Sequence, residues 1–246
     1  MNIFIFISFF YLLLFSVLGY GFLLNKLLFS HKSNVFSIPD HYIGFYGITF
    51  VTFISLLTNI FFSHSYLHNT VLHVFGFFLS CYYFYKNKNF DFPKYIFLIS
   101  AIALSALFIS KSNEDFPYYH LTYTIYLTEN KLIFGAGHLD LGYNLLSSLF
   151  NFNSTFRLPF IDIYSFHFVY IYFLIFFNYF LLNEIFKFKN KCFIFVLYVI
   201  SALYFNLSFN RIAEYGTDKP GQLLIVLISI KLLSIFVEKK ENAILL

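Results

Sequence analysis

The chain has 246 residues, of which 59% are hydrophobic and only 11% are charged, and its formal net charge is +4. Its mean hydropathy is +0.73. A soluble domain usually has about 25% charged residues, so this composition excludes an ordinary water-soluble globular protein. The period-two alternation of apolar and polar residues that is typical of a membrane β-barrel is absent from the sequence. We therefore predict an all-α, polytopic transmembrane helical bundle, with a single domain over residues 1–246.

Apolar segments recur along the whole chain, at close to the ~20 residues that a helix needs to cross a bilayer. We predict seven spans, in chain order Ile3–Leu24, His41–Phe62, Asn69–Tyr85, Tyr95–Ser110, Phe160–Leu182, Cys192–Phe209 and Gly221–Val237. The third, fourth and seventh are short, and flanking lysines and tyrosines at the interface can extend them.

The lysines of the short loops predict the orientation of these spans. They fall on one side of a seven-span topology, in four groups: Lys26 and Lys32; Lys86, Lys88 and Lys94; Lys187, Lys189 and Lys191; Lys239 and Lys240. Because cytoplasmic loops carry an excess of Lys and Arg, this side is expected to be cytoplasmic. The prediction is a multi-pass protein of the inner (cytoplasmic) membrane, with an external N-terminus and a cytoplasmic C-terminus.

The longest external segment, residues 111–159, exceeds the usual helix–helix connection of about 2–8 residues. We expect two short helices in it, lying on the membrane surface. The first runs from Tyr118 to about Thr128. Pro117 is expected in its first turn, because proline suits that position of a helix. The second runs from Tyr143 to Phe150. Gly135-Ala136-Gly137 separates the two.

Asp115 and His120 are the sharpest candidates for chemistry in this loop, with Glu114 beside them. A partly desolvated carboxylate can act as a general base, and a nearby imidazole can orient it or share its proton. The same two side chains can instead hold a divalent cation, since they offer oxygen and nitrogen ligands. The alternative is structural: Asp115 caps the surface helix and His120 is an interface residue.

Further charged residues gather on the predicted external face. Such a mixture suits a substrate with a phosphate head and a lipid tail, because arginine binds phosphate well. The alternative is ordinary solvation of the loops. The candidate substrate-binding residues are Tyr119, Lys131, His138, Asn144, Arg157, Arg211, Glu214 and Asp218.

Polar residues inside the predicted spans have structural interpretations. His73, Asn59 and Asn178 are expected to make hydrogen bonds between helices. Lys231 is expected to extend its ammonium group towards the cytoplasmic surface.

The external loop resembles one found in uncharacterised bacterial multi-pass membrane proteins. The residues that carry the likeness are Asp115-x-x-x-Tyr119-His120, Lys131, Gly135-x-Gly137-His138-Leu139, and Asn144 with Ser147-Ser148. Those proteins are similar to the GT-C superfamily of glycosyltransferases, which use lipid-phosphate-linked sugars on the outer face. The resemblance implies that Asp115, with Glu114 beside it, corresponds to the essential acidic residue of that superfamily. GT-C enzymes usually have more spans, so the resemblance implies either that this chain is the N-terminal part of a longer protein or that it is a short variant.

Three functions remain open at this point. The first is a membrane glycosyltransferase that moves a sugar from a polyprenyl-phosphate-linked donor to an external acceptor of the cell envelope. Its partners are the bilayer and the donor, with no nucleic acid, and a divalent cation is the one cofactor considered. The second is a transporter or lipid-handling protein, which a charge-lined cavity through the helices would favour. The third is a non-catalytic scaffold or remnant.

Overall fold

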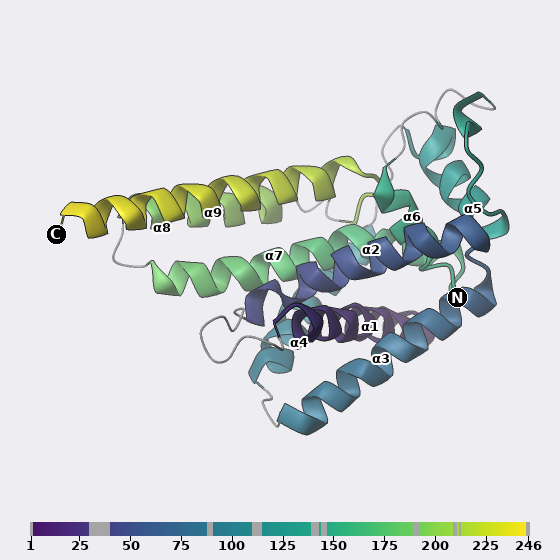
Figure 1. Ribbon diagram of the computed structural model, residues 1–246, viewed down its shortest axis with the longest axis horizontal. Helices are drawn as coiled ribbons and strands as arrows, with labels where there is room; N and C mark the ends of the chain where they lie inside the picture. Colours follow the sequence, from purple (N-terminus) through teal and green to yellow (C-terminus); the bar gives the residue numbers. More distant parts are fainter. Residues whose placement is uncertain are drawn as a thin grey trace.

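The computed structural model describes residues 2–29, 40–87, 91–109, 115–138, 143, 147–188, 192–208, 211 and 213–244. Within these residues the fold is helical, with isolated β-bridge positions such as the pair Leu158 and Asp162. The helices, drawn in Figure 1, are α1 (Ile3–Phe29), α2 (Ile43–Phe61), α3 (Tyr66–Asn87), α4 (Asp91–Leu104), α5 (Leu121–Glu129), α6 (Ser148–Ser154), α7 (Phe168–Lys187), α8 (Cys192–Leu207) and α9 (Asp218–Ile244).

Five helical segments are long and apolar enough to cross a membrane: Ile3–Leu28, Asp40–Phe61, Phe92–Ile109, Ile163–Lys187 and Asp218–Val237. They coincide with five of the seven predicted spans. The other two predicted spans correspond to α3 and α8. α3 is less apolar, since it contains His68, Asn69 and His73, and the 16 residues of α8 fall short of the ~20 needed. A count of seven crossings therefore stays a prediction.

Successive long helices run in opposite directions, so the bundle has two distinct ends. Contacts between α2 and α7 pair Tyr42 with Phe180, and those between α7 and α8 pair Asn178 with Asn206. We call one end the loop end: it carries the start of α1 and the described residues of the segments 62–65, 115–162 and 213–217. The opposite end, with Lys26, Lys86 and Lys187, is the lysine end. Figure 1 shows α5 and α6 at the same end of the molecule as the start of α1, far from the C-terminal end of α9.

The first three helices meet through their backbones. A Cβ atom on Gly19 of α1 would overlap the carbonyl oxygen of Gly76 in α3, and one on Gly47 of α2 would overlap the carbonyl oxygen of Val17. Glycine is therefore required at these crossings, because any side chain would push the helices apart. Small residues at such contacts are a common means of packing membrane helices, whose apolar surfaces gain little from leaving lipid.

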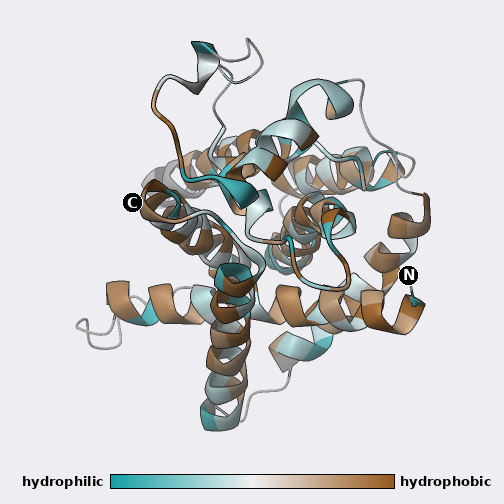
Figure 2. Cartoon of the chain, turned by 90° about the vertical axis from the view of Figure 1, so that its right-hand side faces the viewer, coloured by the Kyte–Doolittle hydropathy of each residue, from teal (hydrophilic) through white to brown (hydrophobic). Residues whose placement is uncertain are grey.

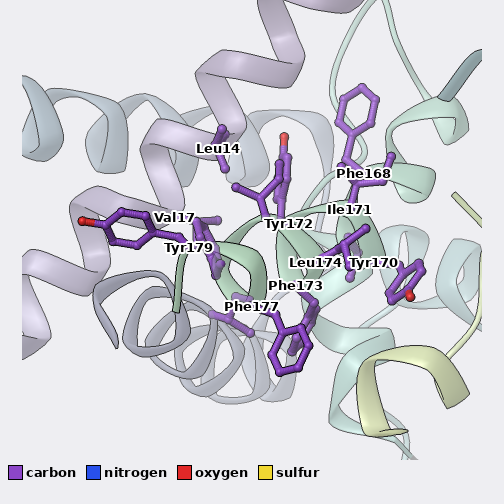
Figure 3. Close-up of a cluster of buried hydrophobic side chains, with 14 of the residues drawn as sticks. Leu14, Val17, Phe168, Tyr170, Ile171, Tyr172, Phe173, Leu174, Phe177 and Tyr179 are labelled. Carbon is purple, nitrogen blue, oxygen red and sulfur yellow. The ribbon is translucent and has the colours of Figure 1, made fainter. Parts of the chain in front are cut away.

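α7 is the central helix of the bundle. Its residues from Phe168 to Phe177 are all buried, on every side of the helix. A helix that is apolar all round is expected to be surrounded by other helices. Figure 3 shows side chains of α7 pointing in different directions, with Leu14 and Val17 of α1 against one side. The hydroxyl group of Tyr172 also donates a hydrogen bond to the carbonyl oxygen of Phe10, at 2.6 Å.

The three predicted interhelical hydrogen bonds are confirmed. His73 contacts the hydroxyl group of Ser16 in α1 at 3.0 Å and donates to the carbonyl oxygen of Thr155 at 3.1 Å. Asn59 donates to the carbonyl oxygen of Leu127 at 3.1 Å. Asn178 and Asn206 exchange amide hydrogen bonds of 2.9 and 2.8 Å.

The short helices of the loop end differ partly from expectation. A single π-helical turn (Phe116–His120) leads into α5, which matches the predicted first helix. The second helix was predicted from Tyr143 to Phe150, but α6 begins at Ser148. The reason is local: Ser147 is the N-cap, and its hydroxyl group accepts a hydrogen bond from the backbone N–H of Leu149. Figure 2, which looks onto this end, shows the short helices paler than the long apolar ones.

Candidate functional site

The candidate site is built on α5, which the tips of α2 and α3 fix to the bundle. The side-chain amide of Asn59 donates to the carbonyl oxygen of Leu127, and the backbone N–H of His64 donates to the same oxygen at 3.0 Å. The backbone N–H of Leu132 in turn donates to the carbonyl oxygen of Asn59 at 2.8 Å. These bonds hold one end of α5, so the π-helical turn at its other end is presented at the surface of the loop end.

Asp115 occupies the N-cap position of the π-helical turn, but its side chain makes no capping hydrogen bond. Pro117 lies in the first turn, as predicted. The Asp115 carboxylate is exposed, and Tyr119 is half-buried beside it. Burial raises the pKa of Tyr119, and the charges of Asp115 and Asp218 raise it further. Asp115 therefore occupies the N-cap position expected in the structural interpretation, but its carboxylate does not make the capping hydrogen bond.

His120 is buried, with 1% of its surface exposed. Neither ring nitrogen has a hydrogen-bonding partner among the described residues. Burial lowers the pKa of His120, because desolvation disfavours the charged ring, and the carboxylates of Asp115 and Asp218 oppose that shift. The carbonyl group of Tyr215 also favours the charged form, although it does not complete a hydrogen bond of good geometry. A buried imidazole without a partner is unfavourable unless a ligand or water completes it.

The loop before α9 packs against the π-helical turn, although its residue Tyr215 is 95 residues after His120 in the chain. Tyr215 is buried beneath the π-helical turn, and its hydroxyl group donates to the carbonyl oxygen of His120 at 3.3 Å and contacts the hydroxyl group of Thr124. Its ring packs edge-on against Phe116. Burial raises the pKa of Tyr215, so its phenol stays protonated. Sequence reasoning missed Tyr215, because one tyrosine among 21 carries little signal.

A small polar depression of about 60 Å³ lies on this loop, lined by Arg211, Glu214, Gly216, Asp218, Lys219 and Gln222. Arg211 is held by both carboxylate oxygens of Glu214, at 2.7 and 2.9 Å. The Arg211 side chain is 52% exposed, whereas that of Glu214 is 6% exposed. The negative charge of Asp218 acts on Arg211 as well as on His120 and Tyr119. Asp218 therefore links the depression to the π-helical turn.

Arg157 belongs to a different cluster. Its guanidinium group donates to Asp162 at 2.7 Å, to the hydroxyl group of Thr128 at 2.6 Å and to Glu129 at 3.2 Å. It also lies 5.2 Å from the centre of the Tyr66 ring. Two carboxylates thus already satisfy the group that the sequence suggested for phosphate.

The remaining predicted residues fall in two groups. Lys131 and His138 are exposed, in the segment after α5. Glu114 and Asn144 lie outside the described residues. No group of three or more His, Cys, Asp or Glu side chains that could hold a metal ion occurs in the described part of the chain. A cation at Asp115 and His120 would therefore need ligands from elsewhere.

A second buried polar cluster, which the sequence did not predict, lies at the lysine end. The Glu184 carboxylate is 3% exposed and accepts hydrogen bonds from Lys231 and from the Tyr198 hydroxyl group, both at 3.0 Å. His41 approaches its other oxygen at 3.5 Å, which is long for a hydrogen bond. Lys231, expected to extend towards the surface, instead binds Glu184, because α9 packs directly against α7.

The comparisons with known proteins give no relative for this site: no protein family, curated protein or solved structure matches the chain.

Proposed function

We propose that the protein is a membrane glycosyltransferase that moves a sugar from a polyprenyl-phosphate-linked donor to an acceptor at the loop end. The observation that carries the proposal is His120, whose ring is buried without a hydrogen-bonding partner within electrostatic reach of Asp115 and Asp218. Such a group indicates a site that a bound molecule completes. The resemblance of the loop to GT-C enzymes supplies the reaction class.

In this mechanism Asp115 is the catalytic residue, because its exposed carboxylate can contact the substrate. It takes the proton from the acceptor hydroxyl group while the acceptor oxygen bonds to the anomeric carbon of the sugar. The bond between that carbon and the donor phosphate breaks, and its electron pair leaves with the polyprenyl phosphate. His120 is a positioning residue that acts through Asp115. Glu214 binds two N–H groups of Arg211, but the guanidinium group is half-exposed, and together with Lys219 in the same depression it supplies positive charge for the phosphate.

Asp115→Asn tests the role of the carboxylate, since it removes the base and keeps the shape. Transfer of a radiolabelled sugar from a polyprenyl-phosphate donor, measured in membranes containing the full chain, should fall by a factor of about 100 or more. The matched control is Glu129→Gln, which neutralises another exposed carboxylate at the loop end, bound to Arg157 rather than near His120. Equal activity of Asp115→Asn and the unaltered chain would remove Asp115 from the mechanism.

The proposal also requires the loop end to face away from the cytosol, where exported lipid-linked sugars are found. The lysines at the other end support this orientation. Introduced cysteines can test it: His138→Cys should react with a membrane-impermeant maleimide added to intact cells, and Lys26→Cys should react only after lysis. Both side chains are exposed and lie at opposite ends. The reverse labelling pattern would exclude an exported donor.

Transport is the second candidate, and the Glu184 cluster favours it, because ionisable groups inside a helical bundle often lie on ion or substrate pathways. The cavity of about 380 Å³ between α4, α7 and α8 is apolar apart from Asn178 and Asn206, however. It lacks the charged lining expected of a transport pathway, so the glycosyltransferase remains the preferred function.

A further inference from the structure

A groove of about 550 Å³ opens at the loop end between α2 and α3, away from the π-helical turn. Its polar lining, from Thr58, Ser63, Ser65 and His68, lies within about a turn of the α2–α3 connection. Its apolar lining continues into the bundle along Ile54, Leu67, Val71, Leu72 and Phe75, with Tyr20 of α1. Phe75 is nine residues into α3, which is about 13 Å along a helix axis. The groove is thus polar at its mouth and apolar in its depth.

The hydrogen bonds of Asn69 fix the chemistry at the mouth. Its amide nitrogen faces three carbonyl oxygens, those of His64, Ser154 and Arg157, at 2.8 to 2.9 Å. Because all three are acceptors, the amide nitrogen must be placed there and the amide oxygen must face the other way. That oxygen lies 3.0 Å from Nδ1 of His68. Nδ1 of His68 is therefore the donor, and a neutral His68 carries its proton on that atom.

In the neutral ring the other nitrogen of His68, Nε2, is consequently a hydrogen-bond acceptor. The ring stacks on His64 at a centroid distance of 4.9 Å and an interplanar angle of 17°, so its orientation is fixed from a second side. Ser63 and Ser65 add hydroxyl groups to the same mouth. The described lining contains no Lys or Arg, so nothing in it selects for phosphate. These groups suit a neutral headgroup that carries hydroxyl donors.

We propose that this groove binds one neutral lipid, whose hydroxyl-bearing headgroup donates a hydrogen bond to Nε2 of His68 and whose chain lies along Ile54, Val71 and Phe75. Val71 and Phe75 are exposed beside α2, which is long and apolar enough to cross a membrane, and in such a crossing their neighbouring medium is hydrocarbon and not water. Headgroup and chain then match the two parts of the groove. The site is separate from that of Asp115 and does not depend on glycosyl transfer.

Photocrosslinking tests the proposal on the purified full chain in phosphatidylcholine nanodiscs. The probe is diacylglycerol with a diazirine on one acyl chain, and the readout is the yield of crosslinks on peptides from α2 and α3. Val71→Trp fills the groove and should lower the yield at least tenfold. Val74→Trp is the matched control: it makes the same change one turn along α3, at an exposed residue outside the lining, and should stay within twofold of the unaltered chain.

The headgroup is tested with His68→Phe, which keeps a flat ring and removes the acceptor. The yield from diacylglycerol should fall about fivefold, as expected for one hydrogen bond, and the yield from a phosphatidylcholine probe should not change. A competition experiment on the unaltered chain does not depend on the folding of a variant. In it, unlabelled diacylglycerol should compete with the probe, and phosphatidylcholine should not. Equal competition by both lipids, or equal yields from the two tryptophan variants, would overturn the proposal.

Discussion

The two ends of the bundle contain buried polar clusters of opposite character. At the lysine end, the Glu184 carboxylate accepts hydrogen bonds from an ammonium group and a phenol of two other elements, and the His41 ring lies 3.5 Å from it without a hydrogen bond. At the loop end, His120 has a similar degree of burial and no hydrogen-bonding partner among the described residues. Burial alone therefore does not distinguish structural from functional polar groups. Hydrogen bonding separates Glu184 from His120, since an unsatisfied group is costly and calls for an explanation.

The largest expected effect comes from breaking the ion pair of Glu184 and Lys231. Glu184→Gln leaves the Lys231 ammonium group without its counter-charge and should lower the free energy of unfolding by about 3 kcal/mol. Thermal unfolding of the detergent-solubilised protein measures this. The double variant Glu184→Gln with Lys231→Met removes both charges and should recover most of the loss. No recovery in the double variant would mean that the ion pair is not what stabilises this end.

A smaller effect on the free energy of unfolding is expected to distinguish His64 from His120, two histidines of the loop end. His64 is satisfied: its Nε2–H donates to the carbonyl oxygen of Ser55 at 3.0 Å, and Nδ1 lies 2.6 Å from the hydroxyl group of Ser154. His64→Phe should lower the free energy of unfolding by about 2 kcal/mol, because buried partners lose their bonds. His120→Phe should change it by less than about 0.5 kcal/mol or increase it.

The same unfolding assay measures both phenylalanine variants. A loss in His120→Phe as large as that in His64→Phe would show that His120 has a structural partner, and the contrast between the two clusters would fail.

The smallest effect, over the first pH unit below 6.5, is a dependence on pH. Burial lowers the pKa of His64 from 6.5 to about 3 and also lowers that of His120. The unfolded chain therefore binds protons that the folded chain does not, and stability should fall as pH drops below about 6.5, by at most about 1.4 kcal/mol per pH unit for each histidine. Below pH 6.5, the melting temperature of His64→Phe should fall less steeply with decreasing pH than that of the unaltered chain. An unchanged slope would show that His64 does not remain neutral in the folded protein.

The helices could be predicted from the sequence because each apolar run carries its own signal, independent of the rest of the chain. Each of the seven predicted segments contains a helix in the structure, although two of these helices are too short or too polar to be assigned as spans. The start of α6 was predicted too early, since the apolar run before Ser148 outweighed the capping signal of Ser147.

The candidate site could be predicted only in part. The residue types at Asp115 and His120 attracted attention, but the lack of a partner for His120 depends on residues far along the chain. The same is true of the Glu184 cluster, because Glu184 and Lys231 are 47 residues apart and nothing local shows that their helices pack together. Which helix faces meet is a property of tertiary packing, and one sequence read alone does not supply it.

The glycine contacts of the first three helices have a mechanical consequence. Where backbone lies on backbone, no side chain can change rotamer to absorb a displacement, so α1, α2 and α3 are expected to shift only as one rigid block. Room for helices to move relative to one another lies elsewhere, around the 380 Å³ cavity between α4, α7 and α8. Any breathing motion that relays a change from one membrane surface to the other should therefore pass through those three helices.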